Sequence, residues 1–424
     1  MRQKMKTELM MKKFDIIVVG GGAAGMMAAS FAAEKNKKVL LIEKNKRVGR
    51  KIAITGKGRC NLTNFCDNDE FINNITSNQK FLFSAINNFS CYDTIDFFEN
   101  LGVETKVERG NRVFPKSDKA VDIANAMHKN LVDKNVEIIY NPITDIIVEN
   151  KSVSGVKLVN NQVLEASKII LACGGMSYSS TGSNGDGYKF AKKCGHTIKP
   201  ILPSLVPLES SNEFCARLKG LSLKNVKISV VDNTFKREVY SDFGEMLFTH
   251  FGLSGPIILS ASAHMRNMSK NRYSIIIDLK PALDFETLDK RVVRDLADNK
   301  NKDIINSLSA LLPKSIIPVV LSLSCIDYHS KCNAVTAEMR HKLVKTLKNF
   351  TVNISKFRPI DEAIVTCGGV CVDEINPKTM ESKITKGLYF AGEMMDVDAY
   401  TGGFNLQIAF STGVLAGKSA AQSD

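Results

Sequence analysis

Residues 14–25 read FDIIVVGGGAAG, an apolar run that ends in a cluster of glycines. The β-branched residues of 14–19 predict a buried strand, and the glycines predict a tight turn after it. Small and apolar residues at helical spacing follow in 23–35, and residues 38–43 (KVLLIE) form a second apolar run. This order predicts a right-handed strand–helix–strand unit of about 30 residues.

Three glycines in this stretch, Gly20, Gly22 and Gly25, have the spacing G-x-G-x-x-G. The first glycine permits the turn, the second lets a pyrophosphate approach the backbone, and the third packs the helix closely against its strand. The helix would begin at Ala23 and Ala24 and present backbone N–H groups to the phosphates. The pattern therefore predicts a dinucleotide site.

The second strand ends at Glu43, whose carboxylate can accept hydrogen bonds from an adenosine ribose. A 2′-phosphate would be repelled by this acid, so the pattern favours FAD or NAD over NADP. The alternative is a tight turn beside a surface acid.

Three later features favour FAD. A basic, glycine-containing loop, residues 47–51, directly follows Glu43, and a strand with a double-glycine turn spans 168–175. A further strand, 387–393, precedes residues 402–407, where a helix would point its N-terminus at the flavin and stabilise an anionic reduced ring. Each feature alone could be a turn before a helix. The further residues expected to hold the cofactor are Lys44, Arg50, Lys51, Thr55, Gly56, Asn61, Gly174, Gly175, Gly392, Glu393, Gly403, Phe404, Asn405 and Leu406.

The composition is that of a folded protein, with 44% apolar and 24% charged residues among 424, a length that predicts two or three domains. No apolar run reaches the roughly 18 to 20 residues of a membrane span, so we expect a cytoplasmic protein without a membrane contact. The ten cysteines include no C-x-x-C pair, which predicts reduced thiols, no disulfide framework and no metal site.

The net charge is +13, and the excess of Lys and Arg lies before residue 356. Such an excess favours a polyanion such as RNA as a partner. The chain is also rich in Asn together with Lys, which can reflect genome base composition instead.

The order of apolar runs predicts an α/β fold in which a Rossmann-like FAD-binding domain is built from two parts of the chain. The expected segments are a basic leader (1–12), the first part of the FAD domain (13–195), an inserted β-rich domain (196–355) and the second part of the FAD domain (356–424). The insertion would contain a helical subdomain over about 286–348.

Four motifs carry a specific resemblance: 49–64 (GRKIAITGKGRCNLTN), 182–187 (GSNGDG), 248–256 (FTHFGLSGP) and 400–405 (YTGGFN). With them the chain resembles the BaiN/RdsA family of NAD(P)/FAD-dependent oxidoreductases from about residue 13 to the end. The resemblance implies a two-part FAD domain interrupted by a β-barrel-like and helical insertion. Family members reduce conjugated enones in bile acids, oxidise amines, or make dihydrouridine in 23S ribosomal RNA.

Reduction of an enone or of a uridine requires a proton donor and a group that polarises a carbonyl, in addition to hydride from the flavin. We expect Cys60 or His250 to be the donor, and Lys57, Arg59 or Asn61 to polarise the carbonyl. Each residue also has an alternative role. Lys57 and Arg59 could contact FAD phosphates, and Asn61 could cap a turn. Cys60 could be a buried thiol and His250 a structural histidine. No second G-x-G-x-x-G is present, so NADH or NADPH would visit the flavin transiently.

Three hypotheses for function follow. The first is a flavin-dependent 23S ribosomal RNA dihydrouridine synthase, which the charge favours. The second is a small-molecule enone reductase or amine oxidase, and the third is a non-catalytic flavoprotein that acts as a binding module or redox sensor. The sequence leaves the oligomeric state open. Candidate RNA contacts are Lys219, Lys224, Lys227, Lys236, Arg237, Arg266, Lys270 and Arg272.

Overall fold

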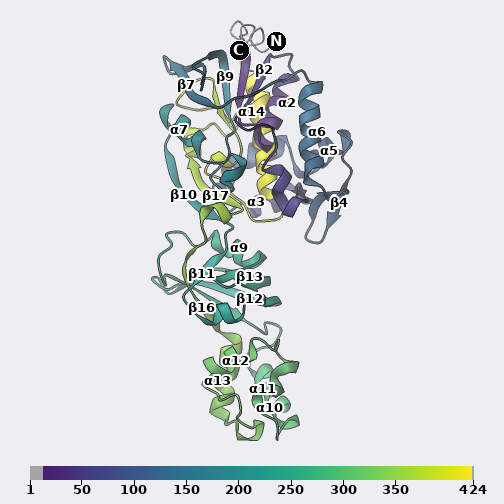
Figure 1. Ribbon diagram of the computed structural model, residues 1–424, viewed down its shortest axis with the longest axis vertical. Helices are drawn as coiled ribbons and strands as arrows, with labels where there is room; N and C mark the ends of the chain where they lie inside the picture. The colour runs from purple at the N-terminus through teal and green to yellow at the C-terminus, as the bar shows by residue number, and fades with distance from the viewer. Residues whose placement is uncertain (1–12, 423–424) are drawn as a thin grey trace. The chain divides into compact units, whose positions relative to one another are not determined.

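The computed structural model describes residues 13–422 and divides the chain into two compact units (Figure 1). Unit 1 comprises Met1–Ser204 and Ile360–Asp424, and unit 2 comprises Leu205–Pro359. The expected basic leader, 1–12, lies outside the described residues. Both boundaries fall a few residues beyond the expected positions, because β10 (Ile198–Ser204) pairs with β17 (Val365–Val370) inside unit 1.

A mostly parallel sheet forms the centre of unit 1, with the strand order β6-β2-β1-β9-β8-β7 and β18 paired to β9. Ile17 of β1 lies opposite Leu40 of β2 and Ile169 of β9. The strands β1, β2, β6, β9 and β18 run parallel, so that their carboxyl ends meet at one edge. The strand bounds are β1 (Phe14–Val19), β2 (Val39–Glu43), β6 (Glu137–Tyr140), β7 (Ile143–Glu149), β8 (Ser152–Leu158), β9 (Val163–Leu171) and β18 (Leu388–Phe390).

Two helices of small residues pack on this sheet, α2 (Ala23–Ala33) and α14 (Phe404–Gln422). A Cβ atom at Gly413 would lie 2.4 Å from the Ala24 carbonyl oxygen, and one at Gly417 would lie 2.3 Å from that of Ala28. The two backbones can approach this closely only because glycine stands at both places. The C-terminal helix is thereby fixed against the helix that follows the glycine turn.

The rest of unit 1 surrounds this centre. In α5, Ser90 caps the first turn and Asp93 returns the bond, a capping box. The remaining helices are α3 (Asn68–Asn73), α4 (Phe83–Asn88), α5 (Cys91–Asn100), α6 (Ala120–Asp133) and α7 (Asp186–Lys193), and a small sheet contains β3 (Thr63–Asn64), β4 (Thr105–Glu108) and β5 (Arg112–Pro115).

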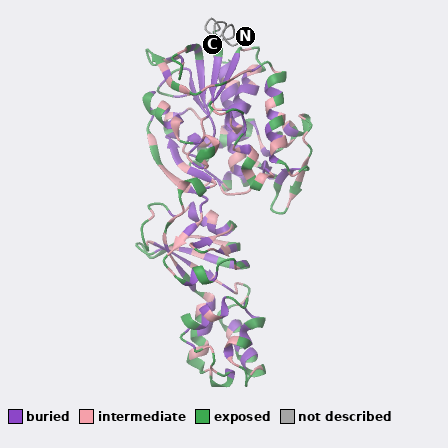
Figure 2. Ribbon diagram, viewed as in Figure 1, coloured by how far each residue is buried: buried purple, intermediate pink, exposed green. Residues whose placement is uncertain are grey.

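Unit 2 is a closed six-stranded barrel with a helical part, as expected for the insertion. The barrel order is β11 (Leu208–Ser210), β14 (Gly252–Ser254), β13 (Arg237–Phe248), β12 (Ser222–Asp232), β15 (Tyr273–Asp278) and β16 (Phe350–Phe357), which pairs back to β11. Helices α8 (Phe214–Arg217) and α9 (Pro256–Ser262) accompany it. Ile228, Val230 and Ile275 are fully buried inside, so the barrel has its own core (Figure 2).

The helical part leaves the barrel after β15 and returns at β16. It contains α10 (Phe285–Asp298), α11 (Ile304–Ser307), α12 (Ile317–Leu323) and α13 (Ala337–Lys348). Asp284 caps α10 by accepting the Thr287 N–H at 2.7 Å, and Thr336 caps α13 through Met339. Within residues 13–422, every helix is too short or too polar to cross a membrane.

Candidate functional site

A cavity of about 390 Å³ opens in unit 1 at the carboxyl ends of β1, β2, β9 and β18. Its walls come from the glycine turn after β1, the loop after β2, the segment 172–190 and residues 391–409. In doubly wound sheets, this edge is where nucleotides bind.

The glycine turn has the geometry that a pyrophosphate requires. Gly20 has φ +108°, and a Cβ there would lie 2.4 Å from the Ala172 carbonyl oxygen. A Cβ at Gly25 would lie 1.8 Å from the Gly20 carbonyl oxygen, so that α2 packs directly on the turn. Apart from Gly22 and its two chain neighbours, no atom of residues 13–422 lies within 4 Å of the position of a Cβ at Gly22, which lines the cavity. A phosphate can therefore approach the backbone at Gly22 and the N-terminus of α2.

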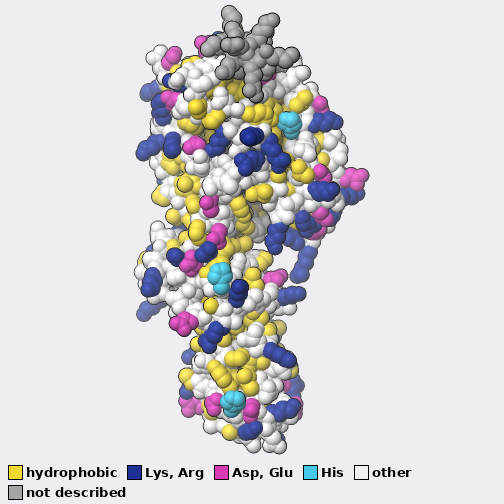
Figure 3. All heavy atoms as spheres, viewed as in Figure 1, with side chains coloured by type: hydrophobic (Ala, Val, Ile, Leu, Met, Phe, Trp, Pro, Cys, Tyr) yellow, Lys and Arg dark blue, Asp and Glu magenta, His cyan; other side chains and the backbone are white. Residues whose placement is uncertain are grey.

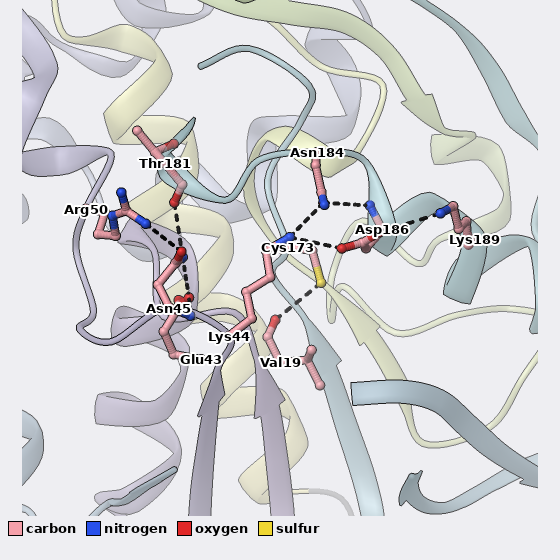
Figure 4. A network of polar contacts seen from close by, with 10 residues as sticks. All are labelled: Val19, Glu43, Lys44, Asn45, Arg50, Cys173, Thr181, Asn184, Asp186 and Lys189. Atoms are coloured by element: carbon pink, nitrogen blue, oxygen red, sulfur yellow. Dashed lines mark hydrogen bonds and ion pairs between the residues drawn. The ribbon is translucent and has the colours of Figure 1, made fainter. Parts of the chain in front are cut away.

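The Glu43 carboxylate is buried at the end of β2 and organises the adjoining loop (Figure 4). One oxygen accepts the Gly21 N–H at 2.8 Å, and the other accepts both the backbone N–H (2.8 Å) and the side-chain amide (2.6 Å) of Asn45. A carboxylate has about four acceptor positions, so one is left for a ribose hydroxyl. The free acceptor position of Glu43 thus fits a hydroxyl of an adenosine ribose.

Basic side chains on the cavity wall are held by polar partners. Lys44 donates to Asn184 (2.6 Å) and pairs with Asp186 (3.0 Å), as Figure 4 shows. Burial raises the pKa of the Asp186 carboxyl, but hydrogen bonds from Lys44 and Asn184 outweigh it, and the pKa is lowered. Arg50 donates to the Asn45 amide oxygen at 2.6 Å. Lys and Arg side chains gather on the face of unit 1 seen in Figure 3, an electrostatic setting suited to phosphates.

The opposite end of the cavity is formed where β18 and α14 meet. Lys51 donates to Glu393 and to Ser177, both at 2.7 Å. The N-terminus of α14 lies here, and Asn405 fixes the preceding loop by donating to the Ala399 carbonyl oxygen (2.7 Å). A Cβ at Gly403 would lie 2.4 Å from the Thr63 carbonyl oxygen, so only glycine fits there. This helix end supplies partial positive charge to a bound ring system.

Most of the residues expected to hold the nucleotide line the cavity. They are Gly20, Gly22, Ala23, Ala24, Glu43, Lys44, Arg50, Lys51, Thr55, Gly56, Asn61, Gly174, Gly392, Glu393, Gly403, Asn405 and Leu406. Gly25, Gly175 and Phe404 do not line it. A Cβ at Gly175 would lie 2.2 Å from the Thr366 hydroxyl, and the Phe404 ring is buried 5.4 Å from that of Phe71. These three residues pack behind the residues that line the cavity.

The loop expected to carry the catalytic groups, 55–61, covers the second half of η1 (Ile52–Gly58) and the residues directly after it, and its side chains diverge. Asn61 lines the cavity; with its amide turned to match its neighbours, it donates to the Thr63 carbonyl oxygen (3.2 Å) and accepts the Gly403 N–H (3.0 Å). Cys60 is fully buried away from the cavity, and burial raises the pKa of its thiol to about 12. Lys57 is exposed and does not line the cavity.

Arg59 points away from the cavity into an ion-pair cluster. It contacts Glu108 at 2.5 Å and Asp118 at 2.6 Å, and its guanidinium lies 4.2 Å from the centre of the Phe114 ring. The hydrogen bonds that its guanidinium donates to these two carboxylates raise the pKa of Arg59. Arg59 does not line the cavity, so its position supports neither carbonyl polarisation nor the alternative of an FAD phosphate contact, and both stay predictions.

His250 belongs to unit 2, in the loop between β13 and β14, where it is exposed and its ring meets the edge of Phe251 at 5.0 Å. Its catalytic role stays a prediction. Among residues 13–422, no group of three His, Cys, Asp or Glu side chains is arranged to hold a metal ion.

Several cavity residues were missed at the level of sequence. Asn45, Cys173, Tyr178 and Tyr400 line the cavity, as does the stretch 181–184. The stretch 181–184 could have been found from the sequence, because the motif GSNGDG (182–187) contains Gly182 and Gly185, and both adopt positive φ.

Comparison with known proteins settles the family. Residues 14–419 match the family described as HI0933-like protein Rossmann domain. The chain belongs to this family. It is 32% identical over 391 residues to the 3-dehydro-bile acid delta(4,6)-reductase of Clostridium scindens, covering 91% of this chain and 93% of that protein. It is 30% identical over 381 residues to the ribosomal RNA dihydrouridine synthase of Escherichia coli, covering 89% and 90%.

A solved structure shares the fold of this HI0933-like protein. The 3-ketosteroid-delta4-(5alpha)-dehydrogenase of Rhodococcus jostii RHA1 superposes with a TM-score of 0.53 at 14% identity, covering 97% of this chain and 98% of that one. The resemblance seen in the sequence motifs is thereby confirmed. The chain is an FAD-dependent oxidoreductase, which sets aside the hypothesis of a non-catalytic flavoprotein.

Proposed function

We propose that this enzyme reduces the C5=C6 bond of a uridine in 23S ribosomal RNA to give dihydrouridine. The observation that carries the proposal is the net charge of +13, which favours a polyanionic substrate such as RNA over a small apolar one. The relative of E. coli, matched over nearly its full length, supports the same substrate class.

We further propose that FAD binds in the cavity of unit 1, with its pyrophosphate at Gly22 and α2 and its ribose at Glu43. When bound, FAD supplies hydride transfer from ring N5. NADH or NADPH would reduce the bound FAD by approaching the flavin transiently, because the sequence contains no second G-x-G-x-x-G turn for a separate nucleotide site.

Uridine reduction delivers hydride to C6 and a proton to C5, and it is accelerated by a donor on the C4 carbonyl oxygen. We propose Asn61, which lines the cavity, for this donor role. One of its two amide hydrogens is directed at the Thr63 carbonyl oxygen, and the other is left for a substrate carbonyl. The Gly403 N–H and the Thr63 carbonyl fix the orientation of the amide, so the donor needs no rearrangement during the reaction.

The first test is genetic. Deletion of the gene should remove one dihydrouridine from 23S ribosomal RNA, as read by mass spectrometry of nuclease fragments, and a plasmid copy should restore it. An unchanged modification profile in an organism that carries this base would refute the proposal.

A second candidate is reduction of a conjugated steroid enone, favoured by the 32% identity to the bile-acid reductase. The chemistry is the same, because hydride again adds to the β carbon of a conjugated carbonyl. This candidate predicts turnover with a free bile-acid dienone at rates that neither RNA nor moderate salt changes.

A further inference from the structure

The hairpin that joins β12 to β13 in unit 2 carries an exposed aromatic ring with two guanidinium groups close to it. Phe235 keeps 61% of its surface exposed. The guanidinium carbon of Arg237 lies 5.5 Å from the centre of this ring, and that of Arg272 lies 5.7 Å from it. The barrel core does not need the ring, because the strands on either side bury their own apolar side chains.

The tip is held in place by contacts with the segment 266–272, which precedes β15. Asn233 donates its backbone N–H to the Arg272 carbonyl oxygen (2.8 Å) and its side-chain amide to that of Asn271 (2.9 Å). The buried carboxylate of Asp232 accepts two bonds from the Arg272 guanidinium, at 2.9 and 3.2 Å. The position of Arg272 over the ring is therefore set before any partner arrives.

The same contacts gather cations from two separate stretches of the chain. Lys236 and Arg237 lie on the hairpin, and Arg266, Lys270 and Arg272 lie on the segment bonded to it. The acids of these two stretches are Asp232, which is occupied by Arg272, and Glu238. The tip thus combines an exposed aromatic side chain with a clear excess of positive charge.

We propose that this tip, residues 233–237 with 266–272, binds single-stranded RNA, with Phe235 stacked on an unpaired base and the Lys and Arg side chains on the flanking phosphates. Proteins recognise RNA chiefly at unpaired segments, through bases stacked on aromatic side chains and cations along the backbone. The inference rests on the proposed RNA substrate and extends it by naming a second contact surface, on the barrel unit.

Unit 2 offers a matched control. Phe243 lies on β13, is 58% exposed and has no Lys or Arg over its ring among residues 13–422. A single exposed phenylalanine is ordinary on a protein surface. If exposure alone mattered, the two rings would behave alike, whereas the proposal gives a role only to Phe235.

The experiment measures binding of the FAD-loaded full-length protein to an unmodified 23S ribosomal RNA transcript at several salt concentrations. Phe235→Ala should raise Kd by about tenfold, the loss of one stacked base, with little change in the salt slope. Phe235→Tyr should keep wild-type affinity, and Phe243→Ala should change nothing. Arg237→Gln should instead lower the salt slope by about one unit.

Two outcomes overturn the inference. If Phe235→Ala binds the transcript as tightly as the wild type does, the ring does not stack on the RNA. The proposed RNA substrate would survive that result, because the wild type still binds RNA. If Phe235→Ala retained affinity for the transcript but lost affinity for a ribosomal particle, the tip would bind a protein instead. Failure of the wild type to bind or modify RNA at all would refute the proposed function itself. Flavin reduction by NADH or NADPH, measured in each variant, verifies that the enzyme remains intact.

Discussion

Two alanine substitutions in the glycine turn should separate FAD binding from stability: Gly22→Ala should weaken FAD binding, and Gly25→Ala should destabilise the FAD-free protein. At Gly22 the backbone is extended (φ −83°, ψ −168°), which alanine adopts freely, and within the described part of the chain the new methyl would meet no atom within 4 Å beyond its two chain neighbours. Gly22→Ala should therefore change the stability of the FAD-free protein by less than about 1 kcal/mol. The methyl would occupy cavity space where the pyrophosphate approaches. Overpacking of about 1–3 kcal/mol corresponds to an FAD Kd roughly 5- to 150-fold higher.

Gly25→Ala is the counterpart. Its methyl would lie 1.8 Å from the Gly20 carbonyl oxygen, so α2 or the turn must move. The gain in helix propensity is about 1 kcal/mol, and the clash should outweigh it and lower the melting temperature of the FAD-free protein. The assay is titration of apoprotein with FAD, followed by flavin fluorescence, together with thermal unfolding of both variants. Wild-type FAD affinity in Gly22→Ala would refute the placement of the pyrophosphate.

Three further predictions concern single side chains. Glu43→Gln replaces one acceptor of charge-assisted bonds by a donor, so FAD affinity measured by titration should fall roughly tenfold; unchanged affinity would argue against the ribose contact. Cys60→Ala should leave the rate of substrate reduction by the reduced enzyme unchanged from neutral to alkaline pH, because the thiol is buried with a pKa of about 12. A changed pH profile in stopped-flow measurements would support Cys60 as the proton donor after all. Burial lowers the pKa of His196 below its ordinary 6.5, so the unfolded chain binds a proton that the folded chain does not. Stability from this group is therefore present above about pH 6.5 and is lost as the pH falls. His196→Gln should flatten the dependence of melting temperature on pH in that window, and identical profiles for both proteins would contradict the assignment.

The nucleotide end of the site could be read from the sequence because it is local. Residues 14–43 are contiguous, the glycine spacing encodes the turn, and Glu43 follows directly after a run of buried apolar residues. The bond from the Gly21 N–H to Glu43 joins two positions of the same strand–helix–strand unit. Such short-range geometry leaves few alternatives.

The catalytic loop could not be resolved in the same way. Cys60 and Asn61 are neighbours, yet the thiol points into the core and the amide lines the cavity. Lys57 and Cys60 both have positive φ, a backbone state that residue types other than glycine rarely signal. Arg59 pairs with Glu108 and Asp118, which lie 49 and 59 residues later in the chain, so local sequence patterns could not reveal its partners.

Contacts across the barrel were equally hidden. Among the candidate RNA contacts, Lys236 and Arg237 lie about 30 residues before Arg266, Lys270 and Arg272 in the sequence. The pairing of β12 with both β13 and β15 brings the two groups together. Strand order and register in a barrel are long-range properties that alternation of apolar residues does not determine. The exposed Phe235 at their centre carries no sequence signal of its own.

The most direct test of the account is a single turnover without oxygen. The FAD-loaded enzyme is reduced, freed of excess reductant and mixed with an unmodified 23S ribosomal RNA transcript or with a bile-acid dienone. We expect the RNA to reoxidise the flavin, with one uridine gaining two hydrogens by mass spectrometry, while the dienone leaves the flavin reduced. A flavin that stays reduced with RNA but is reoxidised by the dienone would contradict the account.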